Sequence, residues 1–104
     1  MINHFRNVNL LQANIPISIP LHITENGWPT GPNRSEEKQA EILEKTLFTI
    51  VHLREQMNIS HYEYFALRDA DSSSDDLGFG LLRDDYSKKP AFENYCSLIC
   101  TYGN

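Results

Sequence analysis

One long amphipathic helix between two short strand-like segments limits the folds open to this chain. The helix is predicted from the N-cap Ser35 to Asn58, because apolar residues recur on one face at helical spacing: Ala40, Leu43, Leu47, Ile50, Val51 and Met57. The segments 21–24 and 59–67 are predicted strands. Two strands joined by a helix form a βαβ unit, so the sequence predicts parallel strands with a right-handed crossover.

The flanking segments extend this alternation. Residues 1–14 have the apolar spacing of a helix, with Asn14 as its stop, and the prolines in 15–20 predict an extended lead-in. A last helix is predicted to begin at Lys88-Lys89-Pro90 and to end at Gly103. The predicted class is therefore α/β, in the order helix, strand, helix, strand, helix.

A parallel sheet of two strands is an incomplete structure. Parallel sheets occur almost only as larger sheets covered on both faces, whereas this one would have two open edges. Residues 1–104 are therefore predicted to form a single incomplete domain. It would be completed by a missing part of the same fold or by self-association through the open edges.

The net charge, the apolar runs and the cysteines indicate which partners and which cellular compartment to expect. The net charge of -5 disfavours nucleic acid and anionic membrane surfaces. No apolar run approaches the roughly 20 residues of a membrane span, and no signal-peptide core follows Met1, so a cytoplasmic location is expected if Met1 is the native start. Cys96 and Cys100 have no nearby histidine and are expected to be buried free thiols; no cofactor or metal is predicted.

Glu25 is the leading candidate for chemistry. It ends an apolar run and is followed by turn-forming residues, which is how a buried parallel strand delivers an acid to the edge of a sheet. The alternative is a loop glutamate whose carboxylate accepts hydrogen bonds from turn amides. If the strand is regular, His22 and Thr24 point opposite to Glu25 and are expected to pack against the flanking helix.

Four segments resemble the retaining glycoside hydrolases with a (β/α)8 barrel, of the β-glucosidase and cellulase type. The most specific of these segments reads Ile23-Thr24-Glu25-Asn26-Gly27-Trp28, and the others are Tyr64 to Asp69, Phe79 to Tyr86 and Lys89 to Phe92. In such enzymes these are strands seven and eight with the loops and helices that follow them. The resemblance therefore implies a partial TIM barrel, the C-terminal quarter of a fold of ~250 residues.

The resemblance also implies roles for individual residues. Glu25 corresponds to the catalytic nucleophile, and a β-linked carbohydrate is the implied ligand. The implied substrate-binding residues are Asn26, Trp28, Tyr64, Arg68 and Asp69. The acid/base carboxylate of such enzymes comes from strand four, which has no counterpart here, so the chain alone is expected to be inactive. Trp28 could instead cover the helix start, and Asp69 could order its loop through Arg68.

Other interpretations remain open from the sequence. Glu63 could be a second acid, but it is predicted in mid-strand rather than at the edge. The acidic loop from Asp69 to Asp75 has the spacing of a calcium loop but lacks its turn glycine and terminal glutamate. The chain could also be a non-catalytic carbohydrate-binding remnant that uses Trp28 and Tyr64, or an assembly module whose strands pair between subunits.

Overall fold

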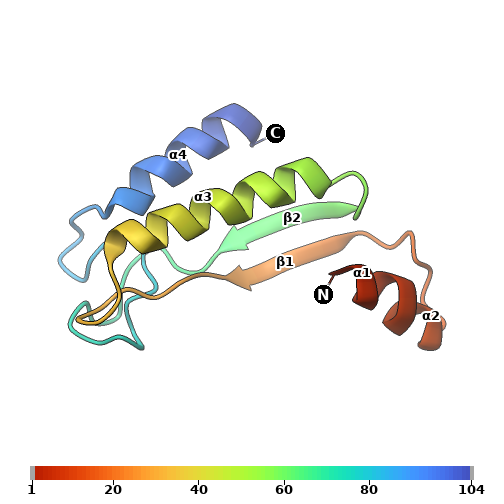
Figure 1. The fold of residues 1–104 in the computed structure, drawn as a ribbon, viewed down its shortest axis with the longest axis horizontal. Helices are drawn as coiled ribbons and strands as arrows, with labels where there is room; N and C mark the ends of the chain where they lie inside the picture. Colours follow the sequence, from red (N-terminus) through yellow and green to blue (C-terminus); the bar gives the residue numbers. More distant parts are fainter. Residues whose placement is uncertain (1, 104) are drawn as a thin grey trace.

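The computed structural model describes residues 2–103 and has the predicted order of elements (Figure 1). The chain begins with a helical segment made of α1 (Ile2–His4), η1 (Phe5–Asn9) and α2 (Leu10–Gln12). The elements that follow are β1 (Leu21–Asn26), α3 (Glu36–Leu53), β2 (Ile59–Tyr64) and α4 (Pro90–Tyr102). β1 and β2 pair in parallel in a two-stranded sheet, which confirms the predicted βαβ unit.

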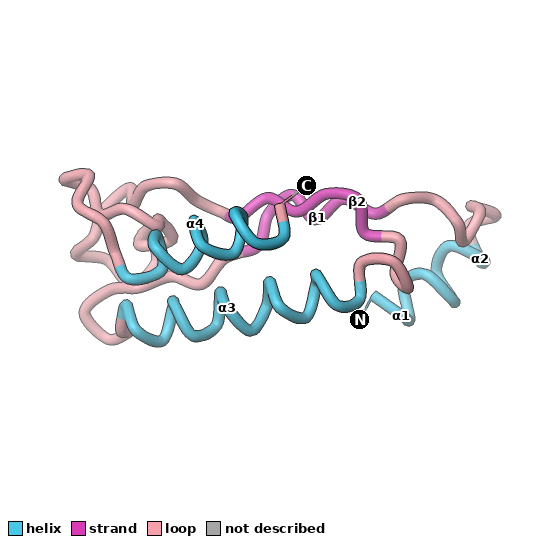
Figure 2. Tube along the Cα trace, turned by 90° about the horizontal axis from the view of Figure 1, so that it is seen from above, coloured by secondary structure: helices cyan, strands magenta, loops and turns pink. Residues whose placement is uncertain are grey.

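Helices cover only one face of the sheet. Seen from above, α3 and α4 lie on the same side of β1 and β2, and the other side, here called the open face, carries no helix formed by residues 2–103 (Figure 2). The core lies under the helices and contains Ala40, Leu43, Leu47, Leu81 and Ala91, with Tyr62, Tyr64, Phe92, Tyr95 and Leu98 packed against it. No helix within residues 2–103 has the length and apolarity needed to cross a membrane.

The helix boundaries follow from local chemistry. The Ser35 hydroxyl accepts a hydrogen bond from the Lys38 amide, which confirms the predicted N-cap of α3. The helix ends at Leu53 rather than continuing to Asn58, because the chain must turn here to enter β2. The Ile59 amide donates back to the Arg54 carbonyl across this turn, and Asn58 takes the left-handed conformation at φ 49°.

Several sequence-based expectations are corrected by the structure. β2 ends at Tyr64 instead of Leu67, and the Phe65–Ala66 peptide that follows it is cis. Residues 15–20 contain a turn, closed by a hydrogen bond from the Ile19 amide to the Pro16 carbonyl, and are not fully extended. Cys96 and Cys100 are free as expected but exposed, because they lie on the side of α4 away from the core.

The register of the sheet is irregular near the end of β1. His22 pairs with His61, Ile23 with Tyr62 and Asn26 with Tyr64, so Thr24 and Glu25 together stand opposite the single residue Glu63. Leu21 and Ile23 are the half-buried side chains of β1. His22 and Thr24 are exposed, so the expectation that they pack against the helix is wrong.

Candidate active site

Glu25 lies at the carboxyl edge, the end of the sheet at which β1 and β2 both terminate. It is the penultimate residue of β1, and its side chain is exposed. The alternative of a loop glutamate is wrong, because the strand continues through Asn26. In parallel α/β folds this edge is where active sites are built, because the loops that follow the strands meet there.

Asn26 is held by the neighbouring strand. The Tyr62 hydroxyl donates a hydrogen bond of 3.0 Å to Asn26 Oδ1. Tyr62 packs against the core under the helices, and burial raises the pKa of its hydroxyl, which therefore stays a donor. This contact fixes the side chain that follows Glu25 and limits the rotation of the end of β1.

Gly27 allows the ends of the two strands to approach closely. A Cβ atom at this position would lie 1.8 Å from the backbone oxygen of Phe65. The two strand ends are also joined by a hydrogen bond of 2.9 Å from the Phe65 amide to the Asn26 carbonyl. The contact is between backbones, so no side-chain rotation could relieve it.

Gly27→Ala is therefore expected to separate the strand ends at the carboxyl edge. Forcing an extra atom into a packed contact costs about 1–3 kcal/mol, and we expect the free energy of unfolding to fall by that amount. Urea denaturation followed by circular dichroism measures it. Thr24→Ala, at an exposed position of the same strand, is the control; an equal loss in both variants would contradict the close approach.

Gln39 connects the two strand ends with the loops above them. Its side chain is fully buried at the start of α3, and the two N–H groups of Nε2 are shared among three acceptors, the carbonyls of Trp28 and Gly80, both at 3.0 Å, and the Tyr64 hydroxyl at 3.2 Å. Tyr64 consequently points under the helices, where burial raises the pKa of its hydroxyl. Trp28 keeps 39% of its surface exposed.

Arg68 follows β2 and is directed outward. Its Nη1 donates to the Asp84 carbonyl at 2.7 Å, and the guanidinium lies 4.8 Å from the centroid of the exposed Tyr86 ring. The structure therefore brings Arg68 together with the loop 83–87. Arg68 and Asp69 form no hydrogen bond with each other, so the loop that begins at Asp69 is not ordered through this pair.

Asp69 is a buried residue of the loop framework. The residue is 1% exposed, and Oδ1 accepts hydrogen bonds of 2.7 Å from both Lys89 Nζ and the Gly80 amide. Lys89, also 1% exposed, donates in addition to the Thr30 hydroxyl at 2.7 Å. These bonds join the loops after β1 and β2 to the start of α4, so the Asp69 carboxylate is committed to protein groups.

The acidic loop is fixed by its own hydrogen bonds. Asp75 accepts from the backbone amide and side-chain amide of Asn33, which lowers the pKa of the Asp75 carboxyl. Asp71 accepts from the Ser73 amide and hydroxyl, which likewise lowers its pKa. Within residues 2–103 no three potential ligands gather to hold a metal ion, so the structure does not support the calcium-loop interpretation.

Phe65, rather than the predicted Tyr64, is the exposed aromatic residue at the carboxyl edge. It follows β2 directly, is 46% exposed and packs edge-on against Phe79, with ring centroids 5.6 Å apart. The alternation of β2 could have indicated it, because Tyr62 and Tyr64 share the face that the helices cover. Gln39 and Lys89 could not be identified as framework residues, because their partners are far away in sequence.

The carboxyl edge as a whole presents two exposed carboxylates, Glu25 and Glu63, and the exposed aromatic residues Trp28 and Phe65. The prediction that Glu63 lies in mid-strand is wrong, because β2 ends at Tyr64 and Glu63 is its penultimate residue. Its carboxylate forms a 2.8 Å contact with His61 Nε2. The arrangement can support nucleophilic attack by Glu25 and stacking of a flat apolar ligand face on Trp28 or Phe65.

No protein family and no curated protein matches the chain, whereas solved structures do. A GH5_18 protein from Streptomyces cattleya, solved in complex with GlcNAc, aligns with a TM-score of 0.67 at 21% identity, over 84% of this chain and 21% of that one. A beta-glucosidase from Exiguobacterium marinum aligns with a TM-score of 0.63 at 22% identity, over 99% of this chain and 26% of that one.

These alignments concern the fold. The chain spans about a fifth to a quarter of the structures that it matches, and both are glycoside hydrolases. Its two parallel strands with their covering helices have the arrangement of part of such a barrel. The predicted fold class, a partial (β/α)8 barrel, is thereby confirmed.

Proposed function

We propose that the chain is the part of a retaining glycoside hydrolase that carries the nucleophile, and that Glu25 is this residue. In the proposed reaction the Glu25 carboxylate attacks the anomeric carbon of a β-linked carbohydrate. A second carboxyl group about 5–5.5 Å away protonates the departing oxygen and then activates water. The single observation that carries the proposal is the place of Glu25, exposed at the end of a barrel strand.

The surroundings of Glu25 support this role. Asn26 and Gly27 hold the strand end against β2, and exposed Trp28 and Phe65 offer aromatic surface on which a sugar ring could stack. Arg68 is an accessible donor for sugar hydroxyls. Asp69 and Tyr64 are assigned to the support of the site, because their polar atoms already bind protein groups.

A chimera tests the nucleophile. The chain replaces the segment that it matches in the beta-glucosidase from Exiguobacterium marinum, which supplies the rest of the barrel. We expect the chimera to release nitrophenol from an aryl β-glycoside and to form a covalent adduct with a 2-fluoro-glycoside. Glu25→Gln should lower turnover about 10³-fold or more and remove the adduct. The 104-residue chain alone should release none.

Two controls make the result specific. Glu63→Gln should leave both turnover and adduct in place, and peptide mapping should find the adduct on Glu25. An adduct that persists in Glu25→Gln, or that maps to another carboxylate, would end the assignment. Turnover by the isolated chain that depends on Glu25 would show that the acid/base also lies within these residues.

The open edges of the sheet favour one other function, that of an assembly module. Each strand pairs on one side only within residues 2–103, so its other edge can accept a strand of a missing barrel part or of a second copy. Light scattering on the isolated chain separates these cases, because a monomer at all concentrations argues against self-association. Calorimetry with β-glucans tests the carbohydrate-binding remnant, for which binding without hydrolysis is required.

A further inference from the structure

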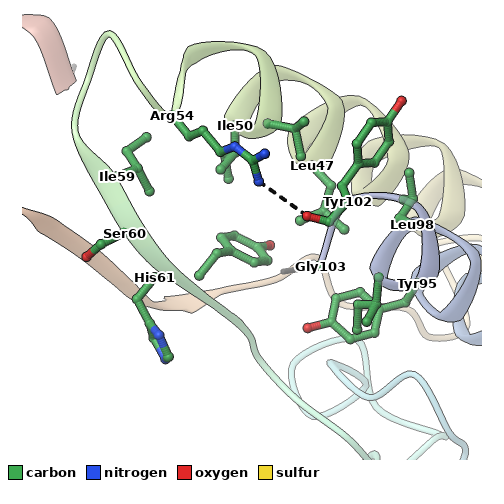
Figure 3. Close-up of a pocket in the computed structure, with 13 residues that line it drawn as sticks. Leu47, Ile50, Arg54, Ile59, Ser60, His61, Tyr95, Leu98, Tyr102 and Gly103 are labelled. Atoms are coloured by element: carbon green, nitrogen blue, oxygen red, sulfur yellow. Dashed lines mark hydrogen bonds between the residues drawn. The ribbon is translucent and has the colours of Figure 1, made fainter.

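Two histidines meet on the open face of the sheet. His22 of β1 and His61 of β2 are register partners, and their ring centroids lie 5.2 Å apart at an interplanar angle of 42°. Both side chains are exposed. Figure 3 shows His61 directed away from α3 and α4, so the pair is open to solvent on the side that no helix covers.

The spacing of the rings suits a shared metal ion. Two imidazoles that bind one tetrahedral ion at metal–nitrogen distances of about 2.0–2.1 Å have centroids about 5 Å apart. The backbone positions are fixed by strand pairing, so little order is lost when both rings turn toward one ion. Within residues 2–103 no third ligand of the His, Cys, Asp or Glu type joins them, so water would complete the coordination.

Glu63 supplies the support that metal-binding histidines commonly have. Its Oε1 lies 2.8 Å from His61 Nε2, which places a carboxylate on one ring nitrogen and leaves Nδ1 to face an ion. Such a contact fixes the tautomer and the direction of the ring and makes it a better ligand. The contact is exposed, so it contributes little to stability.

We propose that His22 and His61, with Glu63 behind His61, form a binding site for a divalent transition-metal ion. The ligands are imidazoles, which suit Cu²⁺, Ni²⁺ and Zn²⁺ rather than Ca²⁺ or Mg²⁺, and among these ions Cu²⁺ binds most tightly to a given nitrogen site. The site uses side chains other than Glu25. The test is made on the 104-residue chain alone, so its outcome does not depend on the proposed glycosidase. In a completed barrel, whose helices lie outside, the open face would line the interior and the pair would be covered.

The test is titration of the 104-residue chain with Cu²⁺, followed by calorimetry and electron paramagnetic resonance. Cys96 and Cys100 are changed to serine in every sample, because exposed thiols would bind or reduce the ion. We expect one site with two equatorial imidazole nitrogens. His22→Asn and His61→Asn should each weaken binding about a hundredfold, because the second ligand binds as an intramolecular group.

Two further variants separate this site from adventitious binding. Glu63→Gln should weaken binding about tenfold while two nitrogens remain coordinated. His52→Asn, at another exposed histidine on α3, should change nothing. A spectrum with one nitrogen would overturn the proposal, as would equal losses in His22→Asn and His52→Asn. Circular dichroism of each variant shows that the fold is intact.

Discussion

Lys89→Met is expected to lower the free energy of unfolding by about 3–5 kcal/mol, because it leaves the buried Asp69 carboxylate without its counter-charge. Both side chains of this ion pair are almost fully buried, with Nζ 2.7 Å from Oδ1. The substitution also removes the donor to the Thr30 hydroxyl. Since a domain of this size has only about 5–15 kcal/mol of stability, much of the chain should unfold at low urea.

The neighbouring lysine provides the control. Lys88 forms a contact of 3.2 Å with Glu93, and both side chains are exposed, so Lys88→Met should change stability by less than about 1 kcal/mol. Asp69→Asn combined with Lys89→Met should be less destabilising than the sum of the single changes, because the pair then loses both charges. Equal midpoints for Lys88→Met and Lys89→Met would contradict the structural role of the pair.

Leu43→Ala is expected to cost about 2–5 kcal/mol, the range for deleting a leucine side chain from a packed core. Leu43 is 2% exposed and lies in the core cluster between α3, α4 and the loop that carries Leu81. Its loss would leave a cavity that the remaining side chains cannot fill. The urea midpoint of the 104-residue chain measures the change.

Phe48→Ala on the same helix is the matched control. Phe48 is exposed and stacks on the exposed His52, with ring centroids 3.9 Å apart, so its removal should cost at most about 1 kcal/mol. A larger loss at Phe48 than at Leu43 would mean that the packed face of α3 has been misidentified.

The order of the elements could be predicted because its signals are local. Ser35 caps α3 through the amide of Lys38, and Pro90 opens α4, as their types and positions indicate. Parallel pairing follows from the single helix that connects the strands. The end of α3 could not be read in the same way, since Met57 continues the apolar pattern but is buried in the turn after the helix.

The candidate site was predictable only in part, because strand periodicity assumes a regular strand. The irregular register between Ile23 and Asn26 sets Thr24 and Glu25 against one residue, which the alternation rule does not anticipate. The pairing of His22 with His61 has the same origin, since a second irregularity follows Leu21. The roles of Asp69 and Lys89 depend on contacts between distant loops, which a local pattern does not encode.

The buried side-chain hydrogen bonds are concentrated at one end of the strands. At the carboxyl edge, Gln39, Asp69 and Lys89 link the loops to both helices through buried groups. At the opposite end, a groove of about 450 Å³ lies between α3, α4 and β2, and a hydrogen bond from Arg54 to the Tyr102 carbonyl crosses it (Figure 3).

Opening the grooved end breaks few contacts, whereas opening the loop end exposes buried charge. Local unfolding should therefore start near Gly103 and travel toward the loops, a sequence that native-state hydrogen exchange can follow residue by residue. The grooved end can therefore unfold locally while the carboxyl edge, which bears Glu25, stays folded.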